Sequence, residues 1–500
     1  MSFNRAIVCD TAAFGVALVI SLLLTPAIRN FAVNHRFLDL VGSVRKIHTR
    51  SIPRLGGVAI VIAWLIAAGF MLTMQPAMQD LFWSLHPRTT VFIIGGLLAA
   101  GIGMVDDVRG LRARYKLAAQ LAIGALLCWG GFTVHELQLP GNVVLQLGPL
   151  AVPFTMLWVA GVMNAMNLID GLDGLAAGVA GIALTTTLVL ALAMSQPLLA
   201  LYTAALLGAV IGFLVYNFNP ASIFMGDAGA LFLGYSLSVA LLVPARAQSW
   251  RMLEVAVPFA ILGVPIADTM LSIARRALRG RGLFSPDRGH LHHRLLALGM
   301  SQRQAVLTIY AASVVLAVGA VAMGFGEGYV DILVCVALFA AAIIALRLLG
   351  VFDLRLERMR AERQRNFKLR AMVSHIRTML QRVARLDEVF DSIHQLAPAL
   401  SAIAVRARIG SVSFEHPPVP FSGRPFEVRF SLGDGLWQVG DVVIVWGDGR
   451  DGLEEDHALA IEEVCENITL AVRRVSPQAI DRSVSPALEF VPVRRRSVGD

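Results

Sequence analysis

Largely apolar runs of at least about 18 residues recur through the first 350 positions of this 500-residue chain, and each is long enough to cross the hydrocarbon core of a bilayer. Buried helices of a large soluble protein would carry a polar stripe, but Val91–Met104 and Ile332–Leu346 contain no polar side chain. Only 16% of the residues are charged, whereas soluble domains carry about 25%. The sequence therefore predicts an all-α membrane protein with many spans, the first of which is not a cleaved signal peptide.

Eleven spans are expected, and the loops between them form two alternating sets. The spans run approximately over 7–28, 55–74, 89–105, 115–132, 151–167, 175–194, 198–216, 224–243, 254–273, 304–323 and 329–348. One set of loops holds 16 Lys and Arg residues, and the other set holds three. The first set consists of 29–54, 106–114, 168–174, 217–223 and 274–303. Because cytoplasmic loops are enriched in Lys and Arg, the first set is placed in the cytoplasm, with the N-terminus outside and the C-terminus inside. This topology accounts for the net charge of +8, so no nucleic-acid partner is needed.

The remaining polar groups gather at the cytoplasmic ends of the predicted spans. They are Lys46 and His48 before the second span, Asp106 and Asp107 after the third, Asn164, Asn167, Asp170 and Asp173 at the end of the fifth, Gly226 and Asp227 at the start of the eighth, Asp268 within the ninth, and His290, His292, His293 and Arg294 before the tenth. Charged groups at span depth are costly and usually face a cavity or one another. The sequence therefore predicts one site at the cytoplasmic face.

Five carboxylates converge in this prediction, and they would repel one another without a cation. Mg²⁺ takes one or two carboxylates and completes its shell with water and phosphate oxygens. The histidines and the cations Lys46 and Arg294 suit phosphate groups as well. Carboxylates beside cations are what metal-assisted phosphoryl transfer requires, with Mn²⁺ as a second candidate metal.

Simpler structural roles remain open for some of these residues. Asp227, which follows Gly226, has the pattern of a helix N-cap. Asp106 and Asp107 are compatible with a solvated turn, and the histidines with a basic surface loop. A zinc site at the histidines is disfavoured because no cysteines accompany them. Four polar residues at three-residue spacing, Asn164 to Asp173, have no comparable structural explanation.

These motifs resemble the polyprenyl-phosphate N-acetylhexosamine-1-phosphate transferase family, of the glycosyltransferase 4 type. The matching motifs are Lys46-x-His48, Asp106-Asp107, Asn164-x-x-Asn167-x-x-Asp170-Gly-x-Asp173-Gly174, Gly226-Asp227-x-Gly229 and His290-x-His292-His293-Arg294, in family order. The resemblance covers residues 1–350 and is closest to the undecaprenyl-phosphate GlcNAc-1-phosphate transferase branch, because the branch that transfers phospho-MurNAc-pentapeptide carries a different histidine motif.

The resemblance implies a reaction and a role for each residue. An undecaprenyl phosphate attacks the β-phosphorus of a UDP-N-acetylhexosamine, with UDP-GlcNAc as the first choice, and UMP leaves. The lipid product would start surface polysaccharide synthesis, such as that of the lipopolysaccharide O-antigen, at the bacterial inner membrane. Asp106 and Asp107 would be catalytic, and Asp227 and Asn167 would hold the metal. Asn164, Asp170, Asp173 and Gly226 would bind the nucleotide, and Lys46, His48, His290, His292, His293 and Arg294 would bind phosphate and sugar.

The last third of the chain has a different composition. Residues 353–397 read as a basic amphipathic helix that would lie on anionic lipid or pair with a second copy in a homodimer. Residues 402–475 are expected to form a small cytoplasmic α/β domain, with strands at Phe426–Leu432 and Asp441–Trp446 and a final helix at 453–474. This order resembles the end of a GAF-like sensory module, as a fold analogy only. Residues 476–500 are expected to be disordered.

Two further classes of protein fit part of the pattern. A transporter also has many spans, broken helices and intramembrane carboxylates, but transporter sites lie near the bilayer midplane. A membrane sensor whose working part is the C-terminal tail would leave the polar residues from Asn164 to Asp173 unexplained. Both are tested by the position and chemistry of the site.

Overall fold

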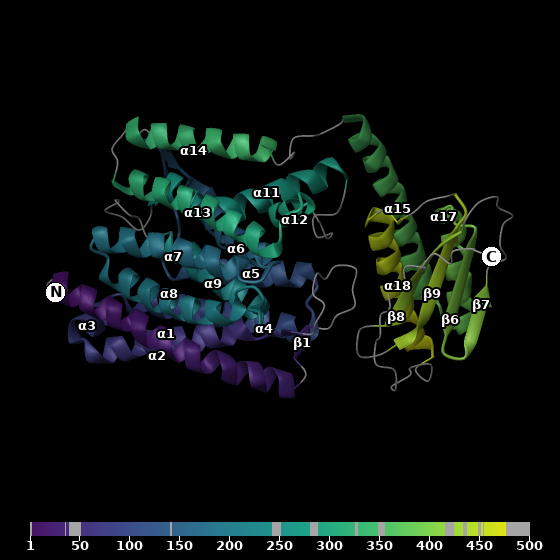
Figure 1. The fold of residues 1–500 in the computed structure, drawn as a ribbon, viewed down its shortest axis with the longest axis horizontal. Helices are drawn as coiled ribbons and strands as arrows, with labels where there is room; N and C mark the ends of the chain where they lie inside the picture. The colour runs from purple at the N-terminus through teal and green to yellow at the C-terminus, as the bar shows by residue number, and fades with distance from the viewer. Residues whose placement is uncertain are drawn as a thin grey trace, which may run out of the picture. The chain divides into compact units, whose positions relative to one another are not determined.

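The helices of the N-terminal part of the chain lie side by side and run in roughly the same direction or its opposite (Figure 1). The computed structural model describes residues 3–35, 37–39, 52–140, 143–242, 252–280, 289–325, 329–348, 356–415, 425–433, 438–448, 452–453 and 455–476. Contacts divide the chain into two units. The first contains Met1–Asp39, Ser51–Ala274 and Asp287–Asp353, and the second contains Leu40–Arg50, Arg275–Pro286 and Leu354–Asp500.

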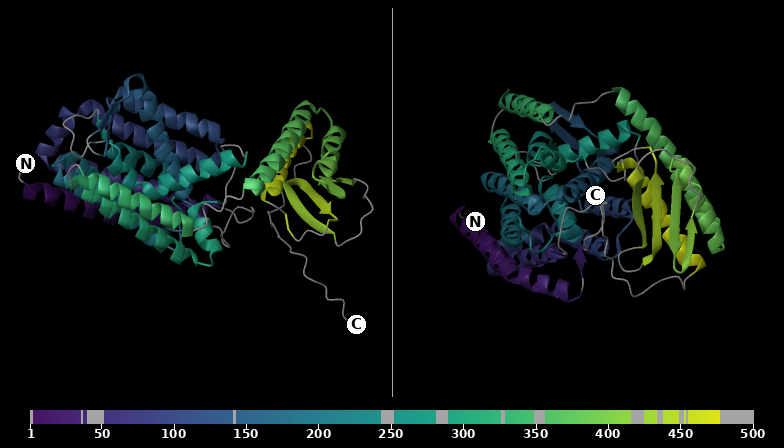
Figure 2. Two further views of the ribbon diagram at one scale, coloured as in Figure 1. Left: turned by 90° about the horizontal axis from the view of Figure 1, so that it is seen from above. Right: turned by 45° about the vertical axis from the view of Figure 1, so that its right-hand side comes forward.

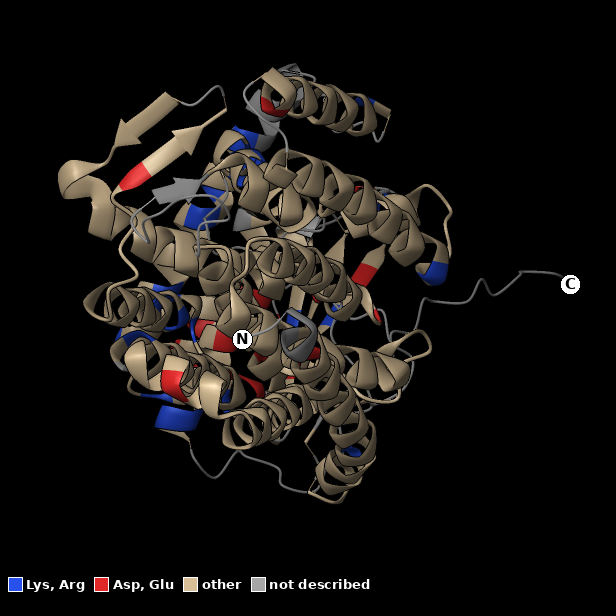
Figure 3. Ribbon diagram, turned by 90° about the vertical axis from the view of Figure 1, so that its left-hand side faces the viewer, with Lys and Arg blue, Asp and Glu red and all other residues tan. Residues whose placement is uncertain are grey.

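The helices of the first unit follow the predicted spans closely. They are α1 (Phe3–Asn34), α2 (Gly56–Met74), α3 (Pro76–Ser84), α4 (His86–Arg109), α5 (Ala113–Trp129), α6 (Ala151–Ile169), α7 (Leu175–Ala193), α8 (Pro197–Asn217), α9 (Gly226–Ala240), α10 (Ala256–Ile261), α11 (Gly263–Leu278, which ends in the second unit), α12 (Leu291–Ala297), α13 (Gln302–Phe325) and α14 (Tyr329–Leu348). Seen along the helices (Figure 3), most of the ribbon carries neither a carboxylate nor a cation, as expected for membrane helices.

Eight of these helices are long and apolar enough to cross a membrane: α1, α2, α4, α6, α7, α8, α13 and α14. The chain is therefore a membrane protein with several spans. The other three predicted spans contain α5, α9 and the pair α10 and α11, which have 17, 15, 6 and 16 residues. The total of eleven stays a prediction.

The predicted span 254–273 contains a break that the sequence analysis did not anticipate. Helix α10 ends at Ile261 and α11 begins at Gly263. Pro265 has no backbone N–H to donate to the carbonyl of Ile261, so the helical hydrogen-bond ladder is interrupted at this point.

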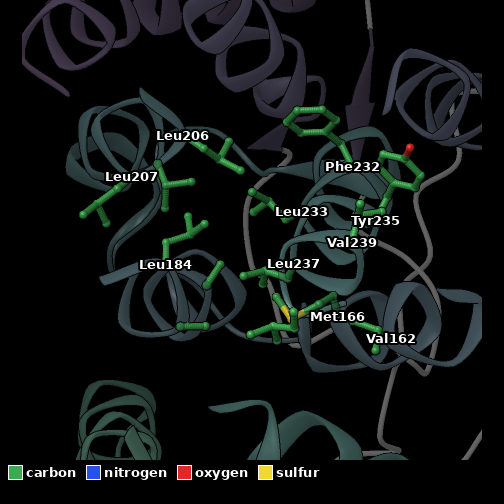
Figure 4. Packing of buried hydrophobic residues seen from close by; sticks show 14 of the residues in the cluster. Val162, Met166, Leu184, Leu206, Leu207, Phe232, Leu233, Tyr235, Leu237 and Val239 are labelled. Carbon is green, nitrogen blue, oxygen red and sulfur yellow. The ribbon is translucent and has the colours of Figure 1, made fainter. Parts of the chain in front are cut away.

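Helix α9 is the central helix of the first unit. Every residue from Ala228 to Val239 is buried. Figure 4 shows its Leu233 and Leu237 among side chains of α6, α7 and α8, including Met166, Leu184 and Leu206. Burial on all sides fixes the position of the first residues of α9, where Asp227 lies.

Glycines allow α2 and α4 to approach the start of α9 very closely. A Cβ atom added to Gly57 of α2 would lie 2.1 Å from the backbone nitrogen of Gly229, and one added to Gly103 of α4 would lie 2.4 Å from the Cα of Ala228. Real Cβ atoms do not approach other atoms this closely, so the backbones of the three helices touch directly. The ends of α2, α4 and α9 are thus held together without intervening side chains.

Two small sheets in the first unit were not predicted. Strands β1 (Leu38–Asp39) and β2 (Ile52–Pro53) pair antiparallel next to the start of α2. Strand β3 (Glu136–Leu139) pairs antiparallel with β4 (Val143–Gln146) and parallel with β5 (Met252–Glu254), at the end of the bundle opposite the start of α9. A 3₁₀ turn, Gly148–Leu150, leads into α6.

The second unit contains a four-stranded antiparallel sheet with helices beside it (Figure 2). Its elements are α15 (Leu356–Arg382), α16 (Leu386–His394), α17 (Leu396–Ala399), β6 (Ala404–Ile409), β7 (Val412–Glu415), β8 (Phe426–Gly433), β9 (Gln438–Trp446) and α18 (Glu455–Val475). The strand order is β7-β6-β9-β8. The expected strands at Phe426 and Asp441 and the final helix are confirmed as β8, β9 and α18, whereas β6 and β7 were missed. Residues 477–500, expected to be disordered, lie outside the described residues.

A separate apolar core holds this unit together. Trp446 and Ile444 of β9 and Ile461 and Ile468 of α18 are fully buried in it. Helix α18 packs on β8 and α15 packs on α18. The α/β character predicted for residues 402–475 is therefore observed.

Candidate functional site

The ammonium group of Lys116 lies at the centre of the polar cluster. Its Nζ is 2.7 Å from Asp106 Oδ2 and 2.6 Å from Asp227 Oδ2. It also donates to Asn167 Oδ1 at 3.1 Å. The side chains of Lys116 and Asp106 are only 12% and 11% exposed, so these charges interact with little screening by water.

These groups come from helix ends at one end of the bundle. Asp106 lies in the last turn of α4 and Lys116 in the first turn of α5. Asn167 lies in the last turn of α6, and Asp227 is the second residue of α9. The predicted convergence of Asp106, Asn167 and Asp227 on one end of the membrane unit is therefore observed.

The two asparagines of α6 contact different partners along the same side of the helix. Asn167 Nδ2 donates to Asp227 Oδ1 at 2.6 Å. Asn164, one turn earlier, donates to Gln120 Oε1 at 2.6 Å, and Gln120 is completely buried. Lys116 and Gln120 are four residues apart and face α6 together. Sequence reasoning missed both, although a Lys and a Gln at this spacing inside an apolar helix were a detectable signal.

Asp107 has a different neighbour from Asp106. Its Oδ1 accepts a hydrogen bond from the backbone N–H of Asp227 at 2.9 Å, and its Oδ2 accepts one from Ala228 at 3.1 Å. The carboxylate thus caps the N-terminus of α9, where unpaired N–H groups favour a negative charge. The expectation that Asp227 is the N-cap was wrong: Asp107 supplies the cap from another helix, which frees the Asp227 side chain to bind Lys116 and Asn167.

Gly226 is required for this arrangement. Its φ is +72°, a conformation that other residues rarely adopt. A Cβ atom there would lie 2.6 Å from Asp107 Oδ2. The Gly226-Asp227 pair therefore combines a sharp entry into α9 with contact to the Asp107 carboxylate.

The turn after α6 holds the next two predicted residues. Asp170 ends α6, and Gly174, with φ +77°, precedes α7, so the helix breaks where the glycines predicted. Burial raises the pKa of Asp170 to about 8. The charges of Asp227 and Asp107 raise this pKa as well, whereas Arg54 lowers it. Asp170 therefore lies in the field of Asp227, one of the two carboxylates that contact Lys116.

Asp173 ties this turn to the segment between α8 and α9. Its Oδ2 accepts hydrogen bonds from Asn219 Nδ2 and from the backbone N–H of Ala221, both at 3.0 Å. Its Oδ1 is buried and has no hydrogen-bond partner among the described residues. One oxygen of Asp173 therefore links the turn to the α8–α9 segment, whereas the other makes no hydrogen bond within the described residues.

The histidine segment is anchored by the aspartate of α11. His290 Nδ1 lies 2.9 Å from Asp268 Oδ2, and the backbone N–H of Leu291 donates to Asp268 Oδ1 at 2.8 Å. The ring of His292 lies against Gly171, where a Cβ atom would be 2.7 Å from His292 Nε2. The histidines are therefore not merely surface residues: His290 and His292 are buried, and His292 contacts the Asp170–Gly174 turn.

The charge state of His292 follows from this burial. Burial lowers the pKa of His292 to about 3, and the charge of His293 acts in the same direction, so the ring is neutral at pH 7. Its Nδ1 is buried without a partner in the described part of the chain. His293 and Arg294 follow at the start of α12. Lys46 and His48 lie outside the described residues.

The atoms around Lys116 Nζ fit the requirements of a hard divalent cation. They are carboxylate and amide oxygens of Asp106, Asp227 and Asn167, which already surround a positive charge at 2.6 to 3.1 Å. No group of three or more His, Cys, Asp and Glu residues is arranged to hold a metal alone within the described ranges. Mg²⁺ binds few protein ligands and takes the rest from water and substrate phosphates, so its presence here stays a prediction.

Comparison with known proteins places this cluster in a family. The model described as glycosyl transferase family 4 matches residues 89–245, which include Asp106, Lys116, Asn167 and Asp227. The probable undecaprenyl-phosphate N-acetylglucosaminyl 1-phosphate transferase of Bacillus subtilis is 35% identical over 315 residues, covering 62% of this chain and 84% of the relative.

Two further relatives extend the comparison. The decaprenyl-phosphate N-acetylglucosaminephosphotransferase of Mycolicibacterium smegmatis is 35% identical over 328 residues, covering 60% of this chain and 79% of the relative. The phospho-N-acetylmuramoyl-pentapeptide-transferase of Listeria welshimeri is 31% identical over 318 residues, covering 61% of this chain and 95% of the relative. The chain therefore belongs to glycosyl transferase family 4, together with these relatives.

Proposed function

We propose that this protein transfers N-acetylglucosamine-1-phosphate from UDP-GlcNAc to undecaprenyl phosphate, releasing UMP and forming a lipid diphosphate sugar. The observation that carries the proposal is the convergence of Asp106, Asp227 and Asn167 on one cation at the ends of four helices. Two relatives whose names state transfer of N-acetylglucosamine phosphate to a polyprenyl phosphate are each 35% identical to the chain.

The acidic cluster would hold Mg²⁺ through Asp227 and Asn167, with Asp106 beside them. Bound there, Mg²⁺ would neutralise charge on the diphosphate of the donor. Lys116 supplies a second positive charge to the same oxygens, so it keeps the two carboxylates together before the metal and the donor arrive. Asp107 acts differently, because both of its oxygens are engaged by the N-terminus of α9.

The reaction is a substitution at the β-phosphorus of the donor. An oxygen of the lipid phosphate forms a new O–P bond, the bond from the β-phosphorus to the bridging oxygen breaks, and UMP leaves with that oxygen. The lipid phosphate is already ionised at pH 7, so positioning and electrostatic stabilisation carry most of the rate. We therefore favour direct displacement, in which Asp106 keeps the lipid phosphate deprotonated and forms no covalent intermediate.

The nucleotide and sugar would lie along the Asp170–Gly174 turn. The free Oδ1 of Asp173 and the side chains of Asn164 and Asp170 offer hydrogen-bond partners to uridine. His290, His292, His293 and Arg294 would meet the diphosphate and the sugar, together with Lys46 and His48. The neutral, unpartnered Nδ1 of His292 suits a hydroxyl or amide group of the sugar better than an isolated negative charge.

The protein would lie in the bacterial inner membrane with this end of the bundle in the cytoplasm. The loops predicted to face the cytoplasm hold 16 Lys and Arg residues, and the other loops hold three. UDP-sugars are cytoplasmic, so the site faces its donor. The product would then start a surface polysaccharide, such as an O-antigen.

Release of UMP by the purified full-length protein tests the proposal. In detergent with undecaprenyl phosphate, UDP-GlcNAc and Mg²⁺, UMP should form only when lipid and metal are both present. Asp106→Asn and Asp227→Asn should each lower turnover by at least about 100-fold, the usual scale for a group that stabilises transition-state charge. Near-wild-type turnover in both variants would refute the site assignment.

A second candidate, transfer of phospho-MurNAc-pentapeptide, is favoured by the 31% identity to the Listeria welshimeri relative, which is lower than the 35% identity to the N-acetylglucosamine phosphate transferases. A panel of UDP-GlcNAc, UDP-GalNAc and UDP-MurNAc-pentapeptide separates these donors. A transporter would bind a donor without releasing UMP, and the position of the cluster at the helix ends instead of mid-span argues against one.

A further inference from the structure

Helix α15 carries a dense and unbalanced positive charge. Between residues 363 and 382 the sequence contains six Lys and Arg residues and no Asp or Glu. These cations are Arg363, Arg365, Lys368, Arg370, Arg377 and Arg382. Blocks of one charge sign on a surface are commonly interaction sites.

The two faces of α15 differ sharply. Leu369, Val373, Ile376 and Leu380 are buried in the core of the second unit. The opposite face is exposed, and at its centre the phenyl ring of Phe367 is 75% exposed. A large aromatic side chain surrounded by cations is the composition of a helix that lies in a membrane interface.

Other arginines of the second unit behave differently. Arg406 lies 2.8 Å from Glu415, and Arg408 lies 2.8 Å from Asp441, both on the sheet. On α15, Lys368, Arg370 and Arg377 are exposed and make no ion pair with a described carboxylate. Their charge is therefore available to an external anionic partner.

The connection to α14 limits how far the start of α15 can lie from the bilayer. Helix α14, a candidate span, ends at Leu348, and α15 begins at Leu356. The seven intervening residues reach at most about 25 Å when fully extended. Anionic lipids attract cations within roughly one Debye length of the surface, about 8 Å at physiological ionic strength.

We propose that the exposed face of α15 binds the anionic surface of the same membrane, with acidic phospholipid headgroups against Arg363, Lys368, Arg370 and Arg377 and with Phe367 inserted at the headgroup boundary. This contact would hold the second unit against the bilayer. It does not depend on the sugar or lipid substrate, because none of these residues belongs to the acidic cluster of the first unit.

The test uses the full-length protein in nanodiscs of phosphatidylcholine, with or without about one third phosphatidylglycerol. Cys128 and Cys335, the two cysteines that are not fully buried, are replaced by serine. Ala371→Cys, one turn after Phe367 on the exposed face, then carries an environment-sensitive fluorophore. Lipids with a nitroxide at the headgroup boundary report whether the fluorophore reaches the membrane.

The expected result is a several-fold stronger quenching in discs that contain phosphatidylglycerol, lost in high salt. Replacing Arg363, Lys368, Arg370 and Arg377 by Gln should abolish it, because each cation near an anionic surface strengthens binding roughly fivefold. Phe367→Ser should weaken the quenching but leave the salt dependence of the quenching unchanged. The matched control replaces Arg406 and Arg429, exposed but close to carboxylates, and should leave quenching unchanged.

Three outcomes would overturn the proposal. One is quenching that is equal in the two kinds of disc, and another is quenching that survives the fourfold substitution. The third is a fluorophore that remains exposed to water in anionic discs. In that case a second copy of the chain or added RNA, instead of lipid, would shield it from water. A melting curve of the fourfold variant, whose changes are all exposed, verifies that the unit stays folded.

Discussion

The carboxylate of Asp107 accepts a hydrogen bond from the backbone N–H of Asp227 at 2.9 Å, so the end of α4 fixes the start of α9. This contact separates two neighbouring aspartates by function. Asp107 positions the helix that carries Asp227, while Asp106 faces Lys116 directly. The catalytic role that the family resemblance implies for Asp107 stays a prediction, and the structure shows its carboxylate at the N-terminus of α9.

Gly226→Ala should disable the site more than it destabilises the fold. A side chain there meets Asp107 Oδ2 and must adopt a positive φ, at a cost of about 1–2 kcal/mol. The displaced cap would move Asp227, so turnover should fall at least about tenfold. Gly101→Ala on α4, which has open space around it, is the matched control and should be neutral. Turnover and melting temperature measured together check this, and equal turnover in the two variants would contradict it.

Lys116→Met should lower the melting temperature of the metal-free protein. It should also increase the rise in melting temperature that Mg²⁺ causes. Removing one partner of a largely buried ion pair costs about 3–5 kcal/mol, so the variant should melt earlier in EDTA. If Mg²⁺ binds the oxygens that Lys116 contacts, added Mg²⁺ should stabilise the variant more than the wild type. Lys368→Met, on the exposed face of α15, is the control. The same Mg²⁺ response in both variants would show that the ammonium and the metal do not share these oxygens.

Asp170 should make the metal-free protein less stable as the pH rises. An acid whose pKa is about 8 in the folded protein and 3.8 in the unfolded chain holds its proton more tightly when folded. The stability it contributes is present at low pH and is lost between about pH 4 and pH 8. Asp170→Asn, which mimics the protonated acid, should flatten this part of the profile. Thermal melting in EDTA from pH 5.5 to pH 8.5 measures the effect, and parallel profiles for variant and wild type would refute it.

Asp268→Asn should loosen the histidine segment. The substitution removes the charge that faces His290 and leaves buried polar groups poorly matched, at a cost of about 1–3 kcal/mol. Hydrogen exchange of residues 290–297 should become faster. Asp80→Asn on the exposed surface of α3 is the control. Unchanged exchange in the Asp268 variant would mean that Asp268 does not anchor the segment.

The cluster could be located from the sequence because its polar residues stand within or next to apolar segments. Asn164 to Asp173 interrupt an apolar run, and Asp227 opens another, so each is visible without a structure. Lys116 was not recognised, because a basic residue shortly after a cytoplasmic loop fits the positive-inside rule and needs no other explanation. The spacing of Lys116 and Gln120 indicates a polar face on α5, but no local pattern shows that α4, α6 and α9 meet there.

The errors have the same origin in contacts between distant segments. Asp227 has the local pattern of an N-cap, but a carboxylate from α4, 120 positions earlier, takes that place. Strand β6 is short and carries two arginines, and its partner β9 begins about 30 residues later. Strand β7 has only four residues and pairs with β6 alone. The break between α10 and α11 was predictable from Pro265, whereas the pairing of β5 with β3 was not, because it joins residues more than 100 positions apart.

The direct contact of Gly57 with Gly229 has a genetic consequence. No side chain can enter this contact without separating the helix ends that carry the acidic cluster, so even alanine should be poorly tolerated. A variant that is destabilised in this way can fold at a low temperature and unfold at a higher one, which is the behaviour of a conditional allele. Gly57 and Gly229 are thus the positions at which temperature-sensitive mutants of this protein should arise, in cells that depend on its product.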